Sequence, residues 1–92
     1  MKLDKEIVDV AMKAFRGMEV VSGYLAERLI VVPDREADGA SLVMPPWQLR
    51  PDDVRDATHA VYPDGSSAPL ACKDKLDLME SACRREWEGA KR

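Results

Sequence analysis

The chain has 92 residues, enough for one small domain (1–92), and its 46% apolar and 34% charged residues are typical of a folded globular protein. A net charge of −3 and a pI near 5.1 argue against a general nucleic-acid binder, which needs a basic surface to meet the phosphates. No run is apolar enough to cross a bilayer and no secretory signal is recognised, so we expect a cytoplasmic protein without a membrane partner.

The first predicted element is a long amphipathic helix over residues 3–25, ending by Arg28. Its apolar stripe takes steps of four and three residues through Leu3, Ile7, Val10, Ala14, Met18, Val21 and Leu25, with Val8, Ala11 and Phe15 widening one side. We expect this stripe to pack against the later helices of the same chain. The alternative is self-association through the same stripe, which would give a homo-oligomer.

Two short apolar runs follow, at 29–32 and 41–44, on either side of a polar, turn-like segment. This arrangement predicts a β-hairpin, although the first run could instead be the last turn of the long helix. In the polar segment, Asp34, Glu36 and Asp38 alternate like calcium ligands. They lack the glycine placement and final glutamate of an EF-hand loop, so we expect no metal site.

A second helix is predicted from Pro51 to about Val61. Proline suits the first helical position, and Asp52 and Asp53 complement the positive end of the helix dipole. Its proposed inner face consists of Val54, Ala57, Thr58 and Val61. The segment 62–69 then has strong turn chemistry.

A third helix is predicted from Leu70 or Ala71 to Glu88, with the inner stripe Cys72, Leu76, Met79, Cys83 and Trp87. The two cysteines are eleven residues apart, which is roughly 16 Å along a continuous helix and too far for a disulfide between them. We expect both thiols to be buried in the core. His59 falls away from the apolar face and should be exposed.

These elements predict a mainly α domain in which a long N-terminal helix packs with two C-terminal helices. A hairpin between them would make the class α+β. No motif indicates catalysis, a cofactor or a metal, so the sequence favours a non-enzymatic protein-binding module of adaptor or inhibitor type. Binding surfaces often place an aromatic or Met side chain within a rim of charged residues. On this basis, the candidate partner-binding residues are Met44, Trp47, Asp52, Asp53 and Arg55.

Two other functions remain open at this stage. A nucleic-acid-associated regulator would use the basic end at Arg84, Arg85, Lys91 and Arg92, although interleaved glutamates weaken its field. A small hydrolase or thiol enzyme would need Cys72 or Cys83 to be reactive in the folded protein.

Overall fold

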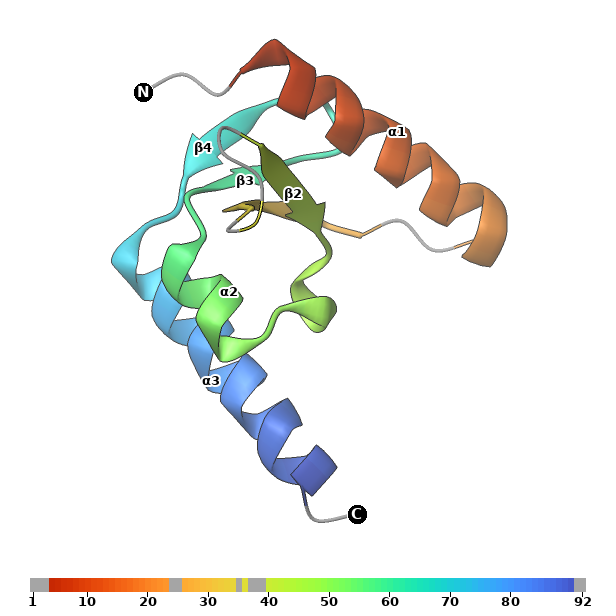
Figure 1. Cartoon of the computed structure of the whole chain (residues 1–92). Coiled ribbons are helices and arrows are strands. Elements are labelled where there is room, and N and C mark those ends of the chain that lie inside the picture. Colours follow the sequence, from red (N-terminus) through yellow and green to blue (C-terminus); the bar gives the residue numbers. More distant parts are fainter. Residues whose placement is uncertain (1–3, 24–25, 35, 37–39, 91–92) are drawn as a thin grey trace.

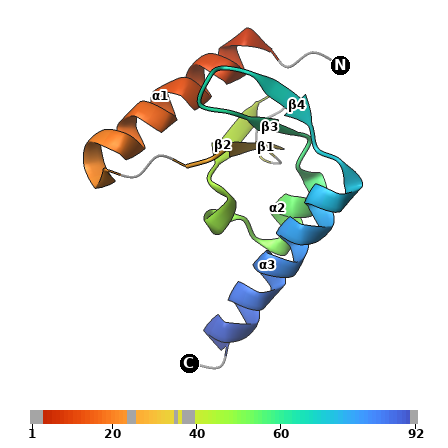
Figure 2. The same ribbon diagram turned by 180° about the vertical axis from the view of Figure 1, so that it is seen from behind.

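The structure, a computed structural model, describes residues 4–23, 26–34, 36 and 40–90. In chain order, these residues form α1 (Lys5–Ser22), β1 (Leu29–Pro33), β2 (Ser41–Met44), the 3-10 turn η1 (Pro46–Gln48), α2 (Pro51–Asp56), β3 (His59–Val61), β4 (Ser67–Pro69) and α3 (Cys72–Ala90). The described strands make one antiparallel sheet in the order β2-β1-β3-β4. α1 covers one face of the sheet, and α2 and α3 cover the other (Figures 1 and 2). The class is therefore α+β, and the predicted mainly α class is wrong.

β1 is the central element, because its first four residues are buried on both faces of the sheet. Ile30 and Val32 belong to the core beneath α2 and α3, whereas Leu29 and Val31 belong to the core beneath α1. A strand covered on both faces gives a continuous apolar run, which explains why this segment also resembled the end of a helix. The predicted hairpin is confirmed by the antiparallel pairing of β1 with β2.

The first helix ends earlier than predicted. Gly23 takes a left-handed backbone conformation, with φ of 70°, and its N–H donates to the carbonyl of Glu19 at 2.9 Å. Glycine adopts this conformation without the steric penalty of a Cβ atom, so it suits the position after the last helical turn. α1 therefore ends at Ser22, and its predicted extension to Arg28 is wrong.

The second helix is also shorter than predicted, because its expected second half forms a strand. α2 ends at Asp56, and His59–Val61 pairs with β1 through Leu29–Val31. The N–H of Thr58 already donates to the carbonyl of Val31 at 3.0 Å. Gly65, with φ of 88°, lies in the turn that carries the chain from β3 into β4. Pairing with a distant strand thus overrides the helical spacing of the local sequence.

α1 packs on the sheet with only part of the predicted stripe, because Ile7, Ala14 and Met18 are partly buried against the core but the centre of the contact lies to one side of them. Ala11 and Phe15 are its buried residues, whereas Val10 is exposed and Val21 is 88% exposed. Residues that the sequence placed at the edge of the stripe therefore lie at the centre of the contact. The small side chain of Ala11 beside the large ring of Phe15 fits the surface formed by β1 and β3.

In α3, the buried side of the helix also differs from the predicted one. Its buried residues are Leu78 and Ala82, which pack on the core beneath α2. Most of the predicted inner stripe points elsewhere, with Leu76 70% exposed and Trp87 63% exposed, although Met79 is partly buried and packs against this core. Both cysteines are exposed as well, so their predicted burial is wrong. The C-terminal part of α3 extends away from the sheet (Figures 1 and 2).

Candidate protein-binding surface

Apart from Leu78 and Ala82, the large apolar residues and the cysteines of α3 form a row along one side of the helix, in which Met79 also touches the core beneath α2. We call this row the α3 stripe, and it consists of Cys72, Leu76, Met79, Cys83 and Trp87. It lies roughly 120° around the helix from Leu78 and Ala82 and runs for about 22 Å along the axis. Met79 is partly buried, and the other four members are exposed. An exposed apolar row of this length is unusual on the surface of a protein that acts alone.

A hollow of about 310 Å³ lies between the start of the α3 stripe and α2. Its lining is formed by Val54, Arg55, Cys72, Lys75, Leu76 and Met79. Val54 is fully buried and belongs to the core, so the hollow has an apolar floor. Its lining thus continues the α3 stripe sideways onto α2.

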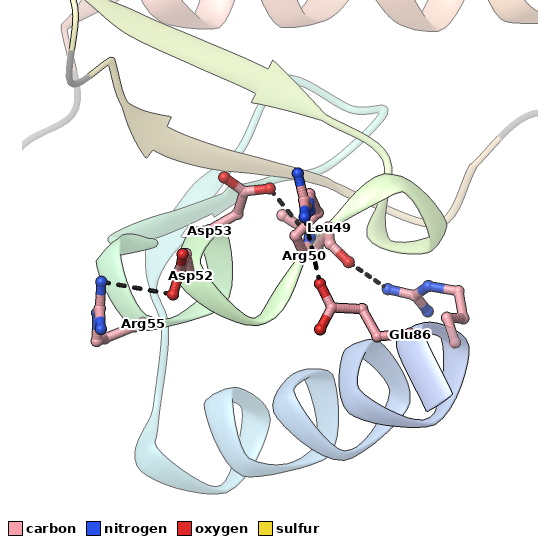
Figure 3. Close-up of polar contacts among 7 residues, drawn as sticks. Leu49, Arg50, Asp52, Asp53, Arg55 and Glu86 are labelled. Carbon is pink, nitrogen blue, oxygen red and sulfur yellow. Dashed lines mark hydrogen bonds and ion pairs between the residues drawn. The ribbon is translucent and has the colours of Figure 1, made fainter. Parts of the chain in front are cut away.

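The charged side chains of the hollow are basic and are held in place. The ammonium of Lys75 donates to the backbone carbonyl of Arg55 at 2.9 Å, at the carboxyl end of α2 where the helix dipole favours a cation. The Arg55 guanidinium lies 3.6 Å from Asp52 (Figure 3) and 3.7 Å from Asp56. The apolar floor is therefore bordered by two cations.

α2 is held beside α3 by contacts at its amino end. The carboxylate of Asp53 accepts the N–H of Arg50 at 3.0 Å, which stabilises the first turn of this six-residue helix (Figure 3). The Arg50 side chain also lies 3.5 Å from Glu86 on α3 (Figure 3). A helix this short has little stability of its own, so its position depends on these contacts and on the burial of Val54.

Arg85 fixes the neighbouring turn η1 to the same helix. Its partly buried guanidinium donates to the carbonyl of Leu49 at 2.7 Å and to that of Pro46 at 3.1 Å. These carbonyls lie at the two ends of η1, so one side chain of α3 satisfies both. Trp47, in the middle of η1, is thereby kept near α3, where it lines a separate hollow of about 320 Å³.

The structure does not gather the five predicted partner-binding residues at one place. Met44 packs against the core beneath α2 and α3, and Trp47 lines the hollow beside η1. Asp53 lines a third hollow, together with Leu42 of β2. Arg55 borders the apolar hollow beside the α3 stripe, and Asp52 is its ion-pair partner. Of the five predicted residues, only Arg55 and Asp52 therefore lie next to the α3 stripe and its hollow.

No protein-family model, curated protein or solved structure matches the chain. Sequence periodicity had found every member of the α3 stripe but assigned the stripe to the core. The available signal was that Leu78 and Ala82 fall outside that stripe, so the helix has two apolar sides rather than one.

The histidine and the acidic residues Asp34 and Glu36 are not part of the α3 stripe or of its hollow. His59 is half-buried on β3, and its Nδ1 lies 2.9 Å from the hydroxyl of Thr58. Asp34 accepts the N–H of Glu36 at 2.9 Å, and Asp38 lies outside the described residues. Across the described part of the chain, no three His, Cys, Asp or Glu side chains are grouped to hold a metal ion.

In the basic end, Arg85 is engaged with η1, and Arg84 pairs with Glu80 at 2.9 Å. Lys91 and Arg92 lie outside the described residues. Among the helices in the described ranges, none is long and apolar enough to span a membrane.

Proposed function

We propose that the protein is a non-enzymatic protein-binding module of adaptor or inhibitor type, acting in the cytoplasm. Its partner-binding surface would be the α3 stripe together with the apolar hollow beside α2. The observation that carries the proposal is the exposure of Leu76 and Trp87 in line with Met79 and two thiols. Large aromatic and Met side chains of this kind are enriched at protein interfaces and supply much of their binding energy.

The shape of the surface favours a helical partner segment. An amphipathic helix presents apolar residues at spacings of three and four, which match the spacing of the α3 stripe. One apolar side chain of such a segment would enter the hollow over Val54. An acidic residue next to it would meet Arg55 and Lys75 at the border of the hollow.

The test compares two substitutions that place a carboxylate at an exposed leucine. Leu76→Glu charges the α3 stripe, and Leu42→Glu is the matched control on β2, where the side chain is 48% exposed. Each variant is immobilised and used to capture proteins from a lysate of the source organism, and bound proteins are quantified by mass spectrometry. We expect Leu76→Glu to reduce capture of a specific partner about tenfold or more, because an interface anchor contributes ~2 kcal/mol or more.

Thermal unfolding checks that both variants remain folded. Equal capture by Leu76→Glu and wild type would place the binding surface elsewhere. A salt-sensitive shift of DNA or RNA in a gel, unchanged by Leu76→Glu, would argue instead for the nucleic-acid function.

A further inference from the structure

We propose that the occupant of the α3 stripe is a second copy of the chain, packed antiparallel about a twofold axis. This inference deepens the proposed function, on which it rests, by naming the partner. It starts from the spacing of four members of the α3 stripe, Cys72, Leu76, Met79 and Cys83, whose steps are four, three and four. The pattern reads the same in both directions about a midpoint between Asp77 and Leu78.

A twofold interface requires this self-complementarity, because if one residue contacts a second, the second contacts the first across the axis. With the axis at that midpoint, Leu76 lies against Met79 of the partner subunit. Cys72 lies against Cys83 of the partner subunit, and the two reciprocal contacts follow by symmetry. Steps of four and three are also those by which paired helices interlock their side chains.

The charges beside the stripe favour the antiparallel direction over the parallel one. Lys73 and Glu80 flank the same side of the α3 stripe. In the antiparallel pair, Lys73 comes within reach of Glu80 of the partner subunit, and the contact occurs twice. In a parallel twofold pair, the flank that carries Lys73 and Glu80 would lie against the opposite flank of the partner's α3, so these two residues would not meet each other. Glu80 pairs with Arg84 within its own chain, and its carboxylate can accept from a second cation.

The charges on the opposite flank are directed toward α2. Lys75 donates to the carbonyl of Arg55, and Glu86 lies beside Arg50. Neither pair needs to break for a second α3 to lie along the stripe. The C-terminal part of α3 extends away from the sheet (Figure 1), and in this register Trp87 lies past the start of the partner's α3, level with the segment that leads into it.

The cysteines allow the arrangement to be tested by cross-linking. Oxidised glutathione is added to the purified full chain, and covalent dimers are measured on a non-reducing gel. Cys72 and the partner's Cys83 lose two protons and two electrons as one S–S bond forms, and the oxidant is reduced to two molecules of glutathione. Such a bond requires the two Cα atoms to lie within about 7 Å.

The antiparallel register predicts a specific pattern. Wild type forms covalent dimers, whereas Cys72→Ser alone and Cys83→Ser alone each form at least about tenfold fewer, because no thiol faces another. An equimolar mixture of the two variants forms dimers at about half the wild-type yield, since half of random pairs are mixed. Leu76→Glu keeps both thiols and is expected to prevent cross-linking. Cross-linking by either single variant alone would indicate a parallel pair and overturn the proposal.

Sedimentation velocity under reducing conditions provides an independent measurement. Wild type is expected to be a dimer and Leu76→Glu a monomer. Val21→Glu is the matched control on the exposed side of α1 and should remain a dimer. A monomeric wild type, or a dimer dissociated by Val21→Glu but not by Leu76→Glu, would overturn the proposal. If the capture assay still showed a partner that depends on Leu76, the proposed function would stand without it.

Discussion

The most direct test of how α1 packs is to truncate one residue on each of its two apolar sides. Phe15 is 2% exposed and packs in the cluster that contains Ala11, Ala26, Leu29, Val31 and Val61. Replacing a buried Phe by Ala typically costs about 3–5 kcal/mol through lost burial and the cavity left behind. A chain of this length is stabilised by roughly 5–14 kcal/mol in total, so Phe15→Ala should remove a large fraction of the stability.

Val21→Ala is the matched control on the same helix. Its side chain is 88% exposed, so truncation removes almost no buried surface. Alanine also has the higher helix propensity, and the expected change is within about 0.5 kcal/mol of zero. The sequence stripe alone would have predicted the opposite order, with Val21 in the core and Phe15 at its edge.

The assay is urea denaturation followed by far-ultraviolet circular dichroism, at a protein concentration low enough to limit association. Phe15→Ala should lower the midpoint strongly, and Val21→Ala should leave it nearly unchanged. A cost above about 1.5 kcal/mol for Val21→Ala, or below about 1 kcal/mol for Phe15→Ala, would refute the assignment of the sheet-facing side of α1.

Two further predictions concern single polar contacts. Arg85→Ala should destabilise the fold by about 1–3 kcal/mol in the same assay, because it removes the guanidinium donor from the carbonyl of Leu49 and leaves that of Pro46 with the N–H of Leu49. Arg84→Ala should change stability by less than about 0.5 kcal/mol, since its ion pair is exposed, and an equal effect of the two variants would contradict the role given to Arg85.

The pKa of Asp64 should lie below its ordinary value, because the hydroxyl and backbone N–H of Ser66 donate to its carboxylate. A lowered folded-state pKa means that this carboxylate's contribution to stability is present above the ordinary pKa and is lost as the pH falls through the folded-state pKa. Titration of Asp64 by NMR should show the low pKa in wild type and a higher one in Ser66→Ala, and identical values would contradict the cause.

Local sequence determined which segments form regular structure wherever the pattern was long or the turn chemistry strong. The long helices and the hairpin of β1 with β2 were predicted, and α3 begins within two residues of the expected start. Apolar residues at helical steps of three and four, and the polar segment after Pro33, are local features of the sequence. They can therefore be recognised without knowledge of the rest of the fold. β3 and β4 were not predicted, because each is too short to show a strand pattern in the sequence. β3 is held by pairing with β1, and β4 by pairing with β3, although the Asp64-Gly65 turn was a usable signal for a hairpin.

Only the tertiary structure decided which apolar residues are buried. Periodicity shows that Cys72, Leu76 and Met79 share a side of a helix, but it does not show whether that side faces a sheet, a partner or solvent. α3 has two apolar sides, and the sheet contacts the one formed by Leu78 and Ala82. The candidate binding surface exists because a helix can place only one of its sides against the core, so most of the other side stays exposed.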